Sequence, residues 1–193
     1  LGEDQTFSIE PDTTDFIKTL SIKGSDETQL FLDFQKYMII LRKQADSLTQ
    51  LIKTQEDPKV REQLSEKLET INENRIARIE KIKKEHPGLF VSAFLNATID
   101  INVPDPPRDD KGRVKDSTWQ YYYYRNHYFD NFDFTDARLL RTPLYEDKIM
   151  TYLTKVIPQV PDSLIPQVDY FIEKARADSN IFRYLLITLL RCP

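Results

Sequence analysis

The sequence predicts a mainly all-α fold, with a long antiparallel helical hairpin followed by an array of shorter helices. Three observations support this prediction. Long stretches rich in Glu, Lys, Gln and Leu favour helices. Apolar residues recur at three- and four-residue steps over two stretches of nearly thirty residues. The chain has only 4 glycines in 193 residues, which argues against a β-rich meander full of tight turns.

Short extended segments are expected near the N-terminus. Phe7 and Ile9 alternate with polar neighbours, and so do Leu20 and Ile22. The two segments could pair with each other, or they could be the trailing edge of a preceding β-rich domain. Residues 1–24 are therefore assigned to such an edge or to a linker, and residues 25–193 to one helical domain.

The first long helix is expected to begin near Ser25 or Asp26 and to end near Thr54. Further apolar residues beside its main stripe predict burial on more than one side. The stripe comprises Leu30, Phe34, Tyr37, Leu41, Leu48 and Leu51, and the residues beside it are Phe31, Met38, Ile39, Ile40 and Ile52.

Asp57 followed by Pro58 predicts the start of the second long helix, which should end before His86 and Pro87. Since only a few residues join the two helices, they should fold back as an antiparallel hairpin. Charges of both signs alternate along the second helix, which is typical of a solvated face.

Shorter helices should follow, separated by a long loop at residues 103–116. Loops of this length inside a compact domain are more often functional or mobile than merely connective. Ser117 is predicted to cap a helix over residues 118–129, and Thr135 a short turn to Leu140. The predicted helices lie at residues 89–97, 118–129, 143–156, 162–177 and 179–191.

Composition excludes several classes of function. A net charge of −4 and a pI near 5.3 predict no attraction to nucleic acid. The longest apolar run is far too short to span a bilayer. Cys192 is the only cysteine, so the chain has no CxxC pair. The start at Leu1, without a leader, suggests an excised piece of a longer protein.

Residues 119–134, reading WQYYYYRNHYFDNFDF, are the most informative stretch, because 10 of these 16 residues are aromatic or imidazole. The rings cover most of a helix circumference, so the stretch either organises a core or presents a binding face. We expect the contact region to comprise this stretch and the 103–116 loop. The candidate contact residues are Trp119, Tyr121, Tyr122, Tyr124, Arg125, His127, Tyr128, Arg108 and Arg113.

Metal and catalytic sites are not predicted. His127, Asp130 and Asp133 have i, i+3, i+6 spacing, but a structural role in ending the helix explains them better. His86 suits the last turn of a helix. Asp105, Asp109 and Asp110 lack the alternating spacing of a calcium loop. We therefore expect no cofactor, no metal and no catalytic residue.

Two strings carry a family resemblance: PPRDDKGRVKDSTWQYYYYRNHYFDNFDFTDARLLRTP and DYFIEKARADSNIFRYLL. They resemble a helical domain of unknown function in bacterial cell-envelope proteins that precedes a thioredoxin-like domain. Such proteins are called thiol:disulfide interchange or redoxin-domain proteins. The similarity extends from about Asp12 over nearly the whole chain, but the W-C-x-x-C redox motif of the family is absent from this sequence.

The resemblance implies a non-catalytic accessory domain in the periplasm or cell envelope. Such a domain would position the redox domain, mediate self-association or hold a client. The implied partners are the protein's own thioredoxin-like domain, a second copy of the chain, or a client protein. An alternative is a helical domain that binds a small ligand or a glycan in an aromatic groove.

Overall fold

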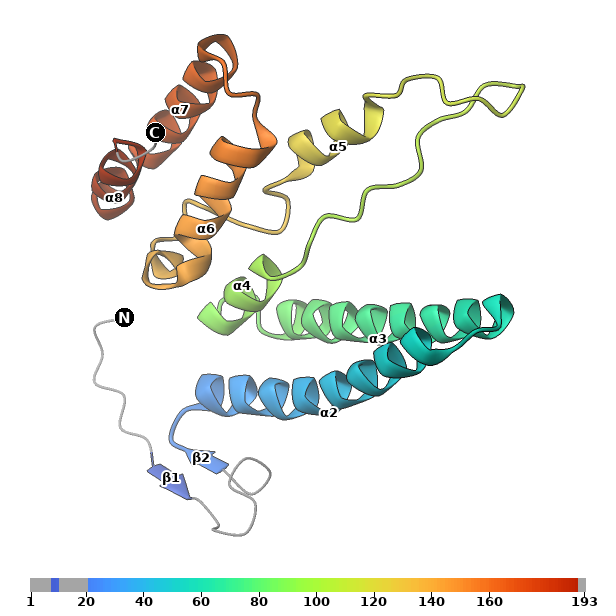
Figure 1. The fold of residues 1–193 in the computed structure, drawn as a ribbon. Helices are drawn as coiled ribbons and strands as arrows, with labels where there is room; N and C mark the ends of the chain where they lie inside the picture. The colour runs from blue at the N-terminus through green and yellow to red at the C-terminus, as the bar shows by residue number, and fades with distance from the viewer. Residues whose placement is uncertain (1–7, 11–20, 191–193) are drawn as a thin grey trace. The chain divides into compact units, whose positions relative to one another are not determined.

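The computed structural model describes residues 8–10 and 21–190, and it confirms the all-α fold (Figure 1). Helices form most of the described chain. The elements are β1 (Ser8–Glu10), β2 (Ser21–Lys23), α2 (Asp26–Thr54), α3 (Pro58–Glu85), α4 (Phe90–Ala97), α5 (Trp119–His127), η1 (Ala137–Arg141), α6 (Pro143–Thr151), η2 (Tyr152–Val156), α7 (Pro161–Ala175) and α8 (Ser179–Leu189).

The two short strands pair with each other, as one of the two alternatives predicted. β1 and β2 are antiparallel, with Ile9 opposite Ile22. Phe7 and Leu20, from the same predicted segments, lie outside the described residues, and so does Cys192. The assignment of residues 1–24 to a preceding domain or linker stays a prediction.

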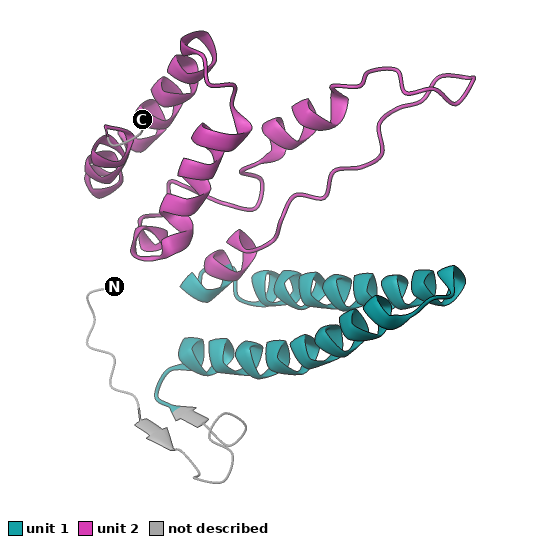
Figure 2. Ribbon diagram, viewed as in Figure 1, with its two compact units in different colours: residues 1–92 teal, residues 93–193 magenta. Residues whose placement is uncertain are grey.

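The chain divides into two compact units, residues 1–92 and residues 93–193 (Figure 2). Unit 1 contains the helical hairpin. Unit 2 contains the 103–116 loop, the aromatic stretch and the C-terminal helices. All of the predicted contact residues therefore belong to unit 2.

The hairpin of unit 1 begins and turns at the predicted residues. Ser25 Oγ accepts a hydrogen bond of 3.3 Å from the backbone N–H of Thr28. Asp57 Oδ1 accepts one of 2.9 Å from the N–H of Lys59, and Pro58 is the first residue of α3. These caps satisfy N–H groups that have no partner within their own helix.

Helices α2 and α3 pack side by side, burying Phe34 and Leu41 of α2. The prediction that α2 is buried on more than one side is wrong for two of its apolar residues: Leu51 is 53% exposed and Ile40 is 57% exposed. Phe31, Met38, Ile39 and Ile52 are half-buried. A single partner helix covers only one stripe of a helix, so residues at the edges of that stripe keep contact with water.

The start of α4 is held within unit 1 by two side chains. Glu27 Oε1 accepts a hydrogen bond of 2.9 Å from the N–H of Val91. Ser92 Oγ donates one of 2.5 Å to the carbonyl of His86, the residue that follows α3. A carboxylate at the beginning of α4 is favoured, because the N–H groups of a first helical turn lack partners within the helix.

Two of the predicted caps in unit 2 are wrong by one residue. The N-cap of α5 is Thr118, and not Ser117, and it makes no side-chain capping bond; Asp116, just before it, accepts a hydrogen bond of 2.8 Å from the N–H of Thr118. Asp136, and not Thr135, accepts one of 3.0 Å from the N–H of Arg138 at the start of η1. Carboxylates and hydroxyls cap about equally well, so adjacent candidates cannot be separated by residue type.

The predicted helix over residues 143–156 has two parts, an α-helix to Thr151 and a π-helix, η2. The N–H of Ile157 donates a hydrogen bond of 3.0 Å to the carbonyl of Tyr152, five residues earlier. α7 begins at Pro161, one residue before the predicted start, which agrees with the preference for proline at the first helical position.

The core of unit 2 lies among α6, η2, α7 and α8. Its residues combine aliphatic side chains with buried rings, and aromatic pairs link neighbouring elements of the unit. The largest fully buried side chains here are Tyr145, Phe171, Leu139, Ile149, Leu153, Ile181 and Leu185.

Candidate functional site

The aromatic stretch of unit 2 has a buried part and an exposed part. Tyr128, Phe132 and Phe134 are 5%, 3% and 6% exposed. Tyr121 and Tyr122 are 38% and 50% exposed. Both alternatives from the sequence therefore have a counterpart in the structure, since one part organises a core and the other presents a surface.

Hydrogen bonds to backbone carbonyls fix the stretch in place. Tyr121 Oη donates to the carbonyl of Val156 over 3.0 Å, which ties α5 to the end of η2. Asn96 Nδ2 donates to the carbonyl of Asn131 over 2.7 Å, and Asn131 Nδ2 donates to the carbonyl of Ile99 over 3.3 Å. The two asparagine bonds hold the segment after α5 against the end of α4 and the residues that follow it.

Burial raises the pKa of the tyrosines around this core. It raises the pKa of Tyr128 to about 12, and it raises the pKa of Tyr124 as well. Burial also raises the pKa of Tyr152, although the Arg125 guanidinium beside that hydroxyl opposes the shift. At neutral pH these phenols are uncharged hydrogen-bond donors.

A row of ring contacts runs along one half-buried face of α5. Trp119 and Tyr123 stack with ring centroids 5.1 Å apart, and Tyr123 and His127 lie 4.2 Å apart. His127 Nδ1 lies 2.7 Å from Asp130 Oδ2. We call Trp119, Tyr123 and His127 the aromatic ladder. Its i, i+4 spacing places the three side chains on one face of the helix.

The tip of the 103–116 loop is ordered by Asp109. Its carboxylate accepts hydrogen bonds from the N–H groups of Lys111 and Arg113, at 2.9 and 2.8 Å, and pairs with the Arg113 guanidinium. Gly112 has a φ of 76°, which glycine adopts without strain. Arg108 Nη1 donates to the carbonyl of Gly112 over 2.9 Å. The loop therefore has a defined turn at its tip.

Asp109 and Asp133, two of the carboxylates considered for metal binding, are bonded within the chain. The bonds from Arg113 lower the pKa of Asp109, despite an opposing effect of desolvation. Asp133 Oδ1 accepts hydrogen bonds from the N–H and the hydroxyl of Thr135, at 2.9 and 2.6 Å. Among residues 8–10 and 21–190, no group of three or more His, Cys, Asp or Glu side chains is arranged to hold a metal ion.

Beside α5, unit 2 has a cavity of about 680 Å³, which we call the aromatic cup. Rings from three parts of unit 2 line it: Phe129, Phe132, Phe134, Tyr152 and Tyr170. Polar side chains also line it: Arg125, Asn126, Asp130, Asp133 and Gln167. Pro166 of α7 completes the wall. The volume of the cup lies within the range of small-ligand pockets.

The predicted contact residues are distributed over these features. Trp119 and His127 belong to the ladder, and Tyr121 and Tyr122 are exposed. Arg125 lines the cup. Tyr128 lies in the core, with the half-buried ring of Tyr124 packed edge-on against it at 5.5 Å. Arg108 and Arg113 hold the loop tip.

Sequence reasoning missed Tyr123, Gln167 and Tyr170. Tyr123 could have been found, because it lies four residues from both Trp119 and His127. Gln167 and Tyr170 come from α7, distant in sequence from the aromatic stretch, and no local pattern relates them to it.

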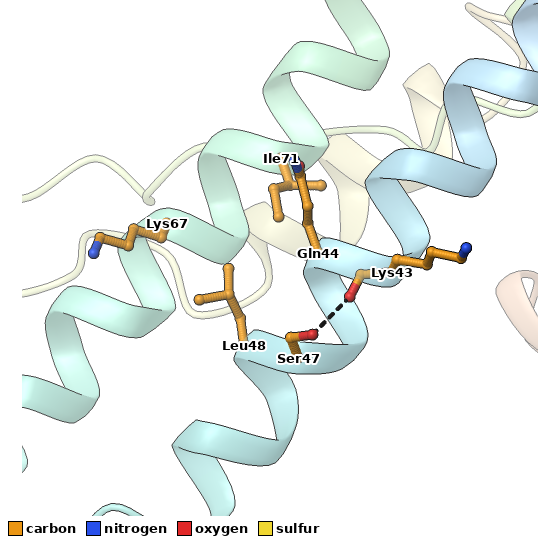
Figure 3. A pocket seen from close by; sticks show the side chains of 6 residues that line it. All are labelled: Lys43, Gln44, Ser47, Leu48, Lys67 and Ile71. Carbon is orange, nitrogen blue, oxygen red and sulfur yellow. Dashed lines mark hydrogen bonds between the residues drawn. The ribbon is translucent and has the colours of Figure 1, made fainter.

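Unit 1 has a groove of about 510 Å³ between α2 and α3, shown in Figure 3. Leu48 and Ile71 lie between the two helices, whereas the ammonium ends of Lys43 and Lys67 point away from each other. Ser47 Oγ donates to the carbonyl of Lys43 over 3.0 Å. The charged groups do not converge here, so the groove has weaker features of a binding site than the cup.

A family described as Domain of unknown function (DUF5106) matches residues 112–191, all within unit 2. No curated protein and no solved structure shows significant similarity to the chain. Within the described part of the chain, no helix is both long and apolar enough to cross a membrane. The family match thus falls on the unit that contains the aromatic ladder and the cup.

Proposed function

We propose that the chain is a non-catalytic helical accessory domain of a cell-envelope thiol–disulfide oxidoreductase. Its role is to position the redox domain, to mediate self-association or to hold a client protein. The aromatic stretch resembles domains that precede thioredoxin-like domains. This resemblance supports the proposed type of parent protein and its proposed periplasmic location. The single cysteine means that the chain itself has no CxxC centre.

One observation carries the proposal that this domain docks a protein. α5 has nine residues, and none of them is buried, although six carry rings: Trp119, Tyr121, Tyr122, Tyr123, Tyr124 and His127. Tyr121 and Tyr122 are exposed, and the other four rings are half-buried. Such a concentration of partly exposed rings is rare on a surface that faces only water. Trp, Tyr and Arg are also the residues that contribute most binding energy at protein interfaces.

The ladder is organised before any partner arrives. Trp119 and Tyr123 stack with an interplanar angle of 28°, and the His127–Asp130 contact supports the far end of the row. Side chains that are already ordered lose less conformational freedom on binding. This arrangement favours α5 as the docking helix and the loop tip, with Arg108 and Arg113, as a neighbouring contact.

A thiol–disulfide assay tests the non-catalytic part of the proposal. The purified chain should reduce a protein disulfide no faster than buffer containing the same thiol reductant. Clear turnover would overturn it. The accessory role predicts that the source gene continues beyond Pro193 into a domain with a Trp-Cys-x-x-Cys sequence. A continuation without that motif would refute the proposed parent protein.

The aromatic cup favours a second function, the binding of a small ligand. The two functions use different surfaces of unit 2 and can coexist. Docking would use the face of α5 that carries Trp119, Tyr123 and His127, whereas a ligand would enter the cavity lined by residues such as Gln167 and Tyr170 of α7.

A further inference from the structure

We infer that the aromatic cup of unit 2 binds an uncharged saccharide. The inference specifies the ligand of the second proposed function, and it does not depend on docking through α5. It is based on the exposed ring surface in the cup, on the type of polar groups around it, and on the presence of both charge signs in its lining.

The rings provide a surface on which the apolar face of a sugar can stack. Tyr170 is 47% exposed and lines the cavity, with its centroid 5.9 Å from that of Phe134. Phe129, which is half-buried, lies 5.7 Å from Phe134. Edge-to-face pairs of this kind hold the rings in fixed orientations. A ligand that covers Tyr170 would remove its exposed face from water.

Planar amides supply hydrogen bonds of the type that sugar hydroxyls need. Gln167 Oε1 accepts a hydrogen bond of 3.1 Å from Tyr152 Oη, which orients the amide, and its Nε2 group carries two donors. Asn126 is exposed and lines the same cavity. An amide can donate to one hydroxyl and accept from another, so both side chains suit a polyol.

The charged residues of the cup are engaged within the chain. Asp130 contacts His127 over 2.7 Å, and Asp133 accepts hydrogen bonds from the backbone and hydroxyl of Thr135. The Arg125 guanidinium interacts with the hydroxyl of Tyr152. Asp133 and Arg125 are bonded to uncharged groups, so both keep their charge in the cup. Because carboxylates and a guanidinium line the same cavity, an anion would be repelled by Asp130 and Asp133, and a cation by Arg125. An uncharged ligand can use the remaining hydrogen-bonding capacity without either repulsion.

Two irregularities of the backbone lie in the wall of the cup. Tyr152 is the first residue of the π-helix η2, and Pro166 lies inside α7. π-helices are rare and occur frequently at functional sites. An interior proline removes one helical hydrogen bond, since it has no N–H to donate. Natural proteins tend to have such irregular helices at functional sites, so their presence in the wall of one cavity is consistent with a binding site.

The test is a titration of the ¹⁵N-labelled chain with maltotriose and with N,N′-diacetylchitobiose, followed by amide chemical shifts. At least one of these uncharged probes should cause saturable shifts at residues around the cup. Tyr170→Ala should weaken binding at least about tenfold, equivalent to about 1.4 kcal/mol. Asn126→Ala, at an exposed position, should also weaken binding without affecting the fold.

Tyr122→Ala is the matched control, because Tyr122 is 50% exposed, Tyr170 is 47% exposed, and Tyr122 does not line the cup. It should bind the probe as the unchanged chain does. Digalacturonate and deacetylated chitobiose test the requirement for an uncharged ligand, and both should bind more weakly. The inference is overturned by the absence of shifts with both uncharged probes, by unchanged affinity in Tyr170→Ala, or by charged probes that bind equally well.

Discussion

The hydroxyl of Tyr145 donates a hydrogen bond of 2.6 Å to the backbone carbonyl of Phe134. Tyr145 lies in the first turn of α6 and is fully buried, and Phe134 is the last residue of the aromatic stretch. The bond therefore fixes the end of that stretch to the helical core of unit 2. It also satisfies the carbonyl of a buried residue, since Phe134 is 6% exposed.

Tyr145→Phe should destabilise the chain, because it removes the hydroxyl and leaves the Phe134 carbonyl without that donor. The expected loss is about 1–3 kcal/mol in the free energy of unfolding. Urea denaturation followed by circular dichroism measures it. Tyr122→Phe, at a 50% exposed position, is the control and should change stability by less than about 0.5 kcal/mol. Equal effects of the two substitutions would show that the buried hydrogen bond contributes nothing.

Stability should fall at alkaline pH. The pKa of Tyr128 is raised from 10.0 to about 12, mainly by burial, so the folded chain holds this proton more tightly than the unfolded chain. The stabilisation that comes from the raised pKa is fully present at pH values below the pKa of this tyrosine in the unfolded chain. It is lost as the pH rises to the pKa in the folded chain. The loss should therefore occur between pH 10 and about 12.

The urea midpoint, measured as a function of pH, tests this expectation. Tyr128→Phe cannot ionise at this position, so its midpoint should fall less steeply over the same pH range than that of the unchanged chain. Some fall should remain, because burial also raises the pKa of Tyr152. Parallel curves for the two proteins would contradict the assignment of Tyr128 as a contributor.

Two leucines of α2 should differ strongly in their contribution to stability. Leu41 is 7% exposed, and Leu51 is 53% exposed. Leu41→Ala should cost about 2–5 kcal/mol, since it removes buried apolar contacts and leaves a cavity. Leu51→Ala should cost less than about 1 kcal/mol, because much of its side chain already meets water. Thermal denaturation of both variants measures the difference, and similar losses would contradict the packing of the hairpin.

The hairpin was predictable because its signals are local. Asp57 and Pro58 mark the start of α3, and the apolar stripe with a helical period marks the packed face. The same pattern could not show which apolar residues lie outside the reach of a single partner helix. Ile40 and Leu51 are exposed for that geometrical reason, although their residue types suggest burial.

The aromatic cup was not predictable from the sequence, because its walls come from distant segments. The aromatic stretch supplies Phe129 and Phe134, whereas Tyr170 follows much later in α7. The π-helix beginning at Tyr152 has no signature that distinguishes it from the α-helix that precedes it. The sequence indicated that residues 119–134 matter, but only the tertiary packing separates their buried part from their exposed part.

Docking through the aromatic ladder is the central claim, and isothermal titration of the chain with the thioredoxin-like domain that we propose for its parent protein tests it most directly. The account predicts saturable binding that Tyr123→Ala weakens at least about tenfold, since rings at the centre of an interface contribute most of its energy. Tyr170→Ala, in the cup, should bind as the unchanged chain does. The absence of binding, or equal affinity of the unchanged chain and Tyr123→Ala, would contradict the account.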